Sequence, residues 1–174
     1  KTARIWEVLS GKEIFRTEAE SKILTDVAIS PDTRFFVTAG YGDSARVYDF
    51  QSKKLITKIP VNADQGSGNG VNIGFSADSK WLGFGEDNRV ATLYHTSDWK
   101  QIYKFEYTEG FCGGCFTALG FSADNKSFFM ASNKGPVKKY DLADGQLVKL
   151  FTEQVEDLQS MAVSGDGKKI LVAT

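Results

Sequence analysis

The sequence predicts an all-β protein built from repeated four-stranded antiparallel sheets, because two markers recur along the chain in the same phase. The first marker is a Ser-x-Asp turn that recurs every 42 to 46 residues. Its serines are Ser30, Ser76, Ser122 and Ser164. The second marker is an aromatic residue near the end of a strand, with the same spacing, at Trp6, Tyr48, Tyr94 and Tyr140. A period of about 40 to 45 residues with about four strands per unit is typical of β-propeller blades.

The clearest repeat lies between Thr117 and Asp141. An alternating run, a polar turn, a more apolar run, a Gly-Pro break and a last strand predict three antiparallel strands there. Applied to the whole chain, this pattern predicts a half blade over 1–17, full blades over 24–59, 71–105 and 117–151, and a half blade over 159–174. We expect an arc of a larger propeller, rather than a ring of four blades closed by joining the two halves.

Within the first full blade, the predicted strands differ in pattern. The first strand alternates, which places Leu24, Val27 and Ile29 near the core between blades. The second strand contains the continuous apolar run 35–37, as expected for a strand covered on both faces.

The turns and strand ends resemble those of WD-repeat β-propellers, and the resemblance covers essentially the whole chain. Ser30-Pro31-Asp32 is similar to the family's turn between the first two strands, and Ile5-Trp6-Glu7 and Tyr48-Asp49 are similar to its Trp-Asp dipeptide. The family's Gly-His pair is missing, its Trp remains only at Trp6, and His95 replaces its Asp. The resemblance therefore implies that the family's hydrogen-bond network within each blade is incomplete. We expect apolar packing between neighbouring blades to hold the fold.

Composition restricts the possible partners. The chain is 41% hydrophobic and 25% charged, with a net charge of −1, which disfavours a general nucleic-acid binder and a polybasic membrane module. A run of about 18 apolar residues, as a membrane-spanning helix needs, does not occur in the sequence. We expect an intracellular, cytoplasmic protein that binds other proteins within a multi-subunit complex, without direct contact to nucleic acid or membrane.

Three motifs suggest chemistry but have simpler explanations. The glycine-rich segment 60–70 precedes a strand, whereas a phosphate loop precedes a helix N-terminus. Cys112 and Cys115 lack the further ligands of a structural zinc site and lie between strands, which favours a tight loop over a disulfide or a metal shared with another chain. His95 is the only histidine and has no predicted nucleophile beside it. We therefore predict a non-catalytic protein without a cofactor or a metal site.

The aspartates of the four Ser-x-Asp turns form a series that resembles a set of carboxylate ligands. Asp32, Asp78, Asp124 and Asp166 each follow a turn serine by two residues. Aspartate in this position typically accepts hydrogen bonds from nearby backbone N–H groups and stabilises the turn. We interpret the series as structural.

The loops predict where a partner binds. In WD-repeat proteins, as the resemblance implies, one face is formed by the loops that join fourth to first strands and second to third strands. Here these loops contain 11 acidic and three basic residues, whereas the rest of the chain has 11 acidic and 18 basic residues. We predict that this acidic loop face binds a basic partner through Glu18, Glu20, Tyr41, Asp43, Glu86, Asp87, Tyr107, Glu109, Phe111, Phe116, Glu153, Glu156 and Asp157.

Two alternatives to a protein-interaction scaffold stay open. The chain could be the regulatory propeller of a larger signalling enzyme. It could also be a propeller enzyme that binds a small molecule or metal in its channel, although matched inward-pointing ligands are not evident in the sequence.

Overall fold

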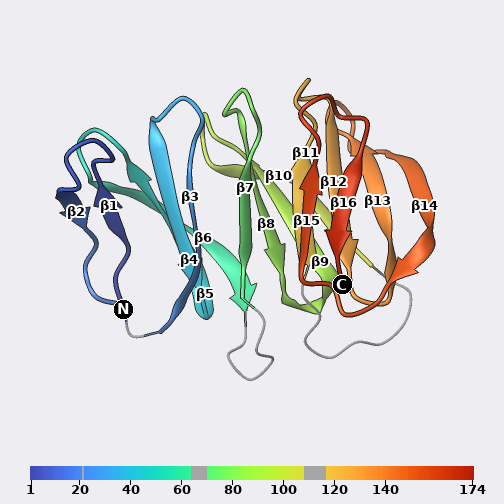
Figure 1. The fold of residues 1–174 in the computed structure, drawn as a ribbon, viewed down its shortest axis with the longest axis horizontal. Helices are drawn as coiled ribbons and strands as arrows, with labels where there is room; N and C mark the ends of the chain where they lie inside the picture. Colours follow the sequence, from blue (N-terminus) through green and yellow to red (C-terminus); the bar gives the residue numbers. More distant parts are fainter. Residues whose placement is uncertain (21, 64–69, 108–116) are drawn as a thin grey trace.

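The computed structural model describes residues 1–20, 22–63, 70–107 and 117–174, and the side chains of 43, 88 and 152–154 lie outside this description. Three four-stranded and two two-stranded antiparallel sheets follow one another along the chain (Figure 1). The all-β prediction is confirmed, and the sheets are consistent with propeller blades.

The strands pair in sequence order within each sheet. The first sheet contains β1 (Arg4–Trp6) and β2 (Glu13–Arg16). The second contains β3 (Leu24–Ile29), β4 (Phe35–Gly40), β5 (Gly42–Asp49) and β6 (Leu55–Ala63). The third contains β7 (Asn72–Phe75), β8 (Trp81–Glu86), β9 (Val90–His95) and β10 (Lys100–Glu106), with the short 3-10 helix η2 (Asp87–Arg89) between β8 and β9.

The remaining strands form the last two sheets. The fourth sheet contains β11 (Thr117–Phe121), β12 (Ser127–Ser132), β13 (Gly135–Asp141) and β14 (Leu147–Val155). The fifth contains β15 (Ser160–Val163) and β16 (Ile170–Ala173).

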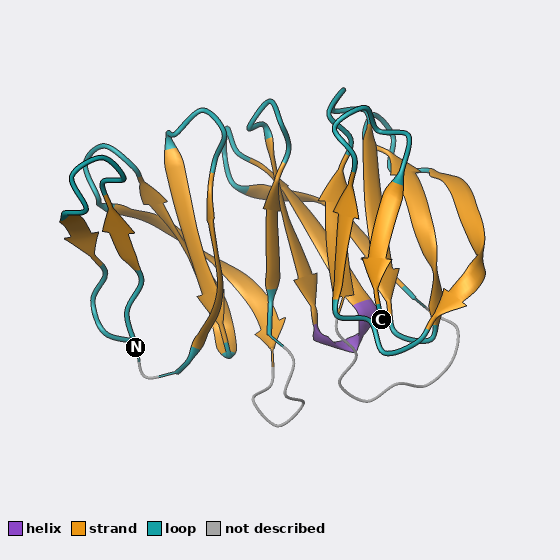
Figure 2. Ribbon diagram, in the orientation of Figure 1, coloured by secondary structure: helices purple, strands orange, loops and turns teal. Residues whose placement is uncertain are grey.

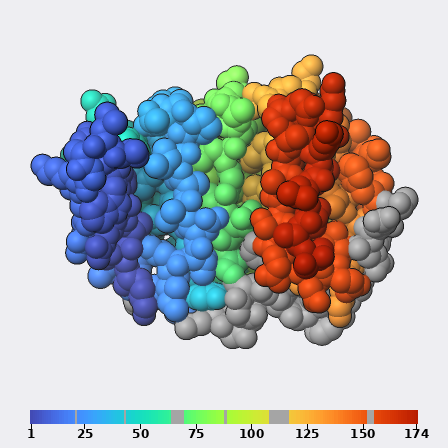
Figure 3. Space-filling view, viewed as in Figure 1, coloured from blue at the N-terminus to red at the C-terminus, as the bar shows by residue number. Residues whose placement is uncertain are grey.

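The first strands of successive sheets lie side by side. β7 contacts both β3 and β11, and β11 contacts β15. The described residues form an open arc, with the dark blue β1–β2 and the red β15–β16 as separate columns in the space-filling view (Figure 3).

Apolar side chains fill the interfaces between the four-stranded sheets. Val37, Val47 and Ile59 of the second sheet pack with Leu82 and Phe84 of the third. A second cluster joins the third and fourth sheets, where Phe105 stacks on Phe128 with ring centroids 5.3 Å apart. Full burial of side chains of this size contributes about 1.5 to 3 kcal/mol each, so these interfaces are the main source of stability.

The placement of Val27 and Ile29 in the core is wrong. Their side chains are 59% and 52% exposed and line a cavity of about 190 Å³ between β1–β2 and β3–β4. Over the described residues, β1 and β2 face this side of the second sheet. Phe15 of β2 packs on Phe36 with ring centroids 5.7 Å apart, but Val27 and Ile29 stay more than half exposed.

Two outermost strands extend beyond the ends expected at 59 and 151. β6 continues to Ala63 because Ile59, Val61 and Ala63 alternate toward the core. Pro60 interrupts this run without breaking the strand, since proline is tolerated in an edge strand. β14 continues to Val155, which packs in the cluster between the fourth and fifth sheets.

The interpretation of the turn aspartates is confirmed. In each turn the serine hydroxyl donates to the aspartate at 2.5 to 2.7 Å, and the carboxylate accepts the N–H two residues further on. The bond from the Ser122 hydroxyl lowers the pKa of Asp124, and that from Ser164 lowers the pKa of Asp166. These carboxylates are occupied in local structure.

Hydrogen bonds between successive sheets add to the apolar packing. At the Ser-x-Asp turns, the N–H of Asp32 donates to Ser79 Oγ at 3.0 Å, and the N–H of Asp78 donates to Asn125 Oδ1 at 3.0 Å. Ser79 and Asn125 occupy the same position of the repeat, and each accepts a hydrogen bond from the turn of the preceding sheet.

Candidate functional site

The loop face predicted from the sequence lies along one edge of the arc. The connections from second to third strands, including the purple η2, lie at the lower edge in Figure 2, opposite the Ser-x-Asp turns. Glu18, Glu156 and Asp157 are exposed there. Three of the predicted contact residues are therefore accessible carboxylates on connections between sheets.

Two more predicted contact residues are half-buried. Glu20 forms an ion pair with Arg46 of β5, which ties the connection before β3 to the second sheet. Tyr41, between β4 and β5, donates its backbone N–H to the Ile23 carbonyl at 3.0 Å. Both residues help to hold neighbouring connections together at this edge.

Glu86 and Asp87 are buried, at 6% and 2% exposure, so their prediction as surface contacts is wrong. Glu86 Oε1 accepts a hydrogen bond from Thr92 Oγ1 at 2.6 Å, and Oε2 accepts the N–H of Asn62 at 2.8 Å. Burial raises the pKa of Glu86, and these two bonds partly offset the rise. The Glu86 side chain thus connects β6 to the third sheet, because it binds Asn62 of β6 and Thr92 of β9.

Tyr107 is also buried, at 7% exposure, and its prediction as an exposed anchor is wrong. Its hydroxyl donates toward the carbonyls of Met130 and Pro136, and the Arg89 guanidinium lies 5.0 Å from its ring centroid. The ring closes the end of the core between the third and fourth sheets. A long aromatic side chain at the end of a loop can either close the core or contact a partner at the surface, and the sequence pattern does not distinguish these two roles.

The other predicted contacts fall outside the description. Glu109, Phe111 and Phe116 lie outside the described residues, as do Cys112 and Cys115. The side chains of Asp43 and Glu153 are likewise not described. The part of the acidic loop face that the structure places is thus Glu18, Glu20, Glu156 and Asp157.

The described residues contain no cluster of three or more His, Cys, Asp or Glu side chains with metal-binding geometry. The ring of His95 bonds the Ser97 hydroxyl at 2.7 Å and lies 5.4 Å from the Trp81 ring centroid. These contacts are those of a structural residue at a turn.

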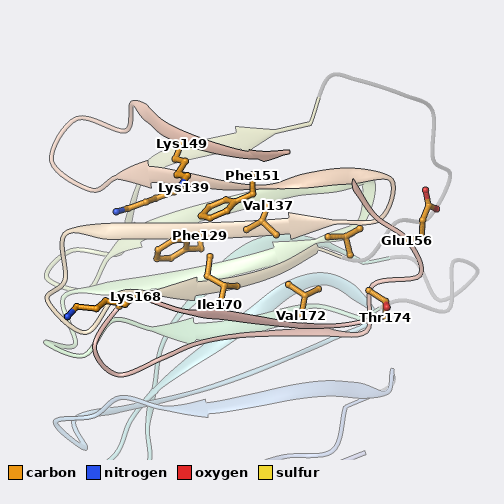
Figure 4. Close-up of a pocket in the computed structure, with 12 residues that line it drawn as sticks. Phe129, Val137, Lys139, Lys149, Phe151, Glu156, Lys168, Ile170, Val172 and Thr174 are labelled. Atoms are coloured by element: carbon orange, nitrogen blue, oxygen red, sulfur yellow. The ribbon is translucent and has the colours of Figure 1, made fainter. Parts of the chain in front are cut away.

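A groove of about 740 Å³ lies between the fourth and fifth sheets (Figure 4). Phe129, Val137, Phe151, Ile170 and Val172 form its apolar floor. Lys139, Lys149 and Lys168 lie at one end, and Glu156 and Thr174 at the other. The described lining is thus an apolar floor with charged or polar residues at both ends.

A membrane-spanning helix, judged by length and apolar character, is not found in the described residues.

Comparison with known proteins supports the resemblance seen in the repeats. The chain is 26% identical over 148 residues to eukaryotic translation initiation factor 3 subunit I of Bombyx mori, covering 78% of this chain and 43% of that protein. It is 24% identical over 171 residues to apoptotic protease-activating factor 1 of Rattus norvegicus, covering 95% of this chain and 13% of that protein. No family model matches the chain.

Both relatives are WD-repeat proteins, and the antiparallel four-stranded sheets agree with that class. The chain is therefore similar to part of two WD-repeat proteins, and its sheets are consistent with propeller blades. It spans less than half the length of either relative.

Proposed function

We propose that this chain is a non-catalytic protein-interaction scaffold that works within a multi-subunit complex. The observation that carries the proposal is its similarity, over 78% of its length, to a protein named as a subunit of a translation initiation factor. A repeated antiparallel sheet provides a rigid frame on which loops present contact residues. The described residues add no clustered catalytic or metal-binding side chains.

The acidic loop face is the surface that we assign to a basic partner. Its exposed carboxylates are Glu18, on the connection from β2 to β3, and Glu156 and Asp157, on the connection from β14 to β15. Single exposed charges contribute only about 0 to 1 kcal/mol, but charges of one sign on one face sum into a field that accelerates encounter. That field decays over a Debye length of about 8 Å at physiological salt, so the association rate should depend on salt.

A charge-reversal experiment tests this assignment. Glu18→Lys combined with Glu156→Lys should slow association with an oligolysine probe and flatten its salt dependence, measured by stopped-flow fluorescence. The matched control is Glu7→Lys combined with Asp144→Lys, which changes the net charge equally at exposed positions in turns between third and fourth strands. Equal slowing by the two pairs, or a rate indifferent to salt, would contradict a role for this face.

The scaffold proposal has its own test. The native protein should elute in size-exclusion chromatography of cell extracts as an assembly larger than its single polypeptide. Elution as a single chain would rule out a constitutive complex.

A second candidate function is regulation of a catalytic domain elsewhere in a longer polypeptide. The similarity of 95% of this chain to 13% of a protein named as a protease-activating factor favours it. Mass spectrometry of the native polypeptide would test this idea, since a regulatory segment requires a chain longer than the 174 residues of this sequence.

A further inference from the structure

Four strands contain a β-bulge at the same position of the repeat. They are β2, β6, β10 and β14, the last strands of the first four sheets. In each case the pairing register skips one residue next to the partner of the marker aromatic. The skipped residues are Ile14, Ile56, Ile102 and Val148. Their spacing of 42, 46 and 46 residues matches that of the aromatic markers, so the bulge is part of the repeat.

Each bulge presents a β-branched apolar side chain to solvent. The exposed fractions are 46% for Ile14, 42% for Ile56, 47% for Ile102 and 56% for Val148. A bulge redirects a side chain and disrupts pairing at an edge, and a charged residue would protect that edge equally well. Repetition of an apolar residue here therefore indicates contact with something outside the sheet.

Cations flank the bulge residue in three of the four strands, in the pattern Lys-x-Ile-x-Lys or Lys-x-Ile-x-Arg over 12–16, 54–58 and 100–104. Their intramolecular partners differ. Arg16 pairs with Glu13 at 2.8 Å, Lys100 pairs with Asp98 at 3.3 Å, and Lys104 pairs with Glu106 at 2.5 Å.

Lys54 and Lys58, which flank Ile56 on β6, are different. Both are exposed, and neither forms an ion pair with any residue that the structure describes. Among the three strands with this pattern, β6 is thus the one on which both flanking cations lack an ion pair with a described residue.

A groove of about 410 Å³ lies beside this strand, between β2 and β5–β6. Its apolar surface comes from Phe15, Tyr48 and Leu55, and its cationic groups are Arg16, Lys53 and Lys58. The lining also contains Glu18, and Glu20, which is paired with Arg46, so cations outnumber acids there. At the position of Lys53, the next repeat has Trp99, whose ring packs against Phe35 with centroids 4.8 Å apart. Lys53 instead donates from its ammonium group to the Phe50 carbonyl and lies 3.9 Å from the centroid of the Phe50 ring, so this position contributes no ring to the interface.

We propose that Lys54, Ile56 and Lys58, with the adjacent groove, form a docking surface for an acidic peptide segment in which carboxylates flank an apolar side chain. The apolar group packs against Ile56 and Leu55 while the carboxylates pair with the two lysines. This β6 docking surface is opposite in charge to the acidic loop face. A scaffold with both surfaces can hold two chemically different partners.

An anionic membrane fits these observations less well. A bilayer would gain from cations spread over the whole rim, whereas both flanking cations on β10 are paired with neighbouring acids and both on β6 are not. A short acidic peptide needs only the local arrangement.

The test uses the full chain and a fluorescein-labelled peptide of alternating glutamate and leucine, followed by fluorescence anisotropy. The parent should bind, and added salt should weaken binding. Lys54→Glu combined with Lys58→Glu should weaken it about tenfold or more, because two attractive charge pairs become repulsive. Ile56→Ser alone should weaken it several-fold.

The sequence supplies a matched control in Lys100→Glu combined with Lys104→Glu, which makes the same charge change around Ile102. Affinity should be nearly unchanged there, and circular dichroism should show that both double variants keep the fold. Absence of peptide binding to the parent, or equal losses in the two double variants, would overturn the proposal. Tighter, equally Lys54-dependent binding to phosphatidylserine vesicles would assign the surface to lipid instead.

A different pair of variants separates this proposal from the acidic loop face, because Glu18 also lines the groove. Glu156→Lys combined with Asp157→Lys should alter oligolysine binding without changing binding of the acidic peptide. Each surface can therefore fail independently of the other.

Discussion

The carboxylate of Asp26 on β3 accepts a hydrogen bond from the backbone N–H of Ile73 on β7 at 2.7 Å. The equivalent position in the next repeat is Asn72, whose Oδ1 accepts the N–H of Leu119 on β11 at 3.3 Å. One side-chain acceptor thus joins neighbouring first strands at two successive interfaces. The acceptor is charged in one case and neutral in the other, so the repeat provides its own comparison.

Asp26→Asn should leave the protein as stable as the parent at neutral pH, or more stable. Burial raises the pKa of Asp26, and the bonds from Ile73 and Val27 only partly offset it, so the folded state favours the neutral form. Because the folded pKa lies above the unfolded one, this group's contribution is most favourable at acid pH and is lost as pH rises through the folded pKa. The advantage of Asn over Asp, measured by urea unfolding, should therefore shrink as pH is lowered.

Asp26→Ala is the companion variant. It removes the acceptor and leaves the Ile73 N–H without its partner, which should cost about 1 to 3 kcal/mol at acid pH and less as pH rises through the folded pKa of Asp26. If Asn destabilised the protein as much as Ala does, the charge rather than the hydrogen bond would be the stabilising element.

Thr33→Asn should stabilise the fold by about 0.5 to 1 kcal/mol. Thr33 has φ of 57°, a left-handed conformation that is unfavourable for a β-branched residue. The equivalent turn positions hold Ser79, Asn125 and Gly167, all at φ near 60°. Unfolding midpoints with an unchanged denaturant slope would measure the gain.

Thr57→Asn is the matched control for that substitution, because Thr57 lies within β6, where asparagine has low strand propensity. It should be neutral or destabilising. A stabilisation of the same size at both positions would show that backbone conformation at Thr33 is not the cause.

The periodic markers predicted the architecture because each marker is a local structure repeated in phase. The Ser-x-Asp turn forms its hydrogen bonds within six residues, so Ser122 through Ser127 already contain the information for that turn. The marker aromatics each lie near the end of a strand, which is also a local feature. Such features need no knowledge of distant partners.

Side-chain exposure was predicted less well, because it depends on neighbours that the local pattern does not specify. Glu86 has the sequence context of a loop acid, yet Thr92 and the N–H of Asn62 bind it in the interior. Val27 and Ile29 alternate as core residues do, but the sheet facing them has only two described strands. The bulges at Ile56 and Ile102 also escaped prediction, since a bulge appears only when the register of two strands is known.

Ser76→Ala should be more destabilising than Ser164→Ala, although both serines form the same two turn bonds. Ser76 Oγ donates to Asp78 at 2.7 Å and accepts the N–H of Trp81 at 3.0 Å, and Ser164 Oγ has equivalent bonds at 2.6 and 2.9 Å. Ser76 is fully buried, whereas Ser164 is half-buried. Loss of the hydroxyl at Ser76 leaves the Trp81 N–H without access to water, which should cost about 1 to 3 kcal/mol. At Ser164 water can replace it, so the cost should stay below about 1 kcal/mol. Urea unfolding of the two variants measures the difference, and equal losses would mean that burial does not set the strength of these turns.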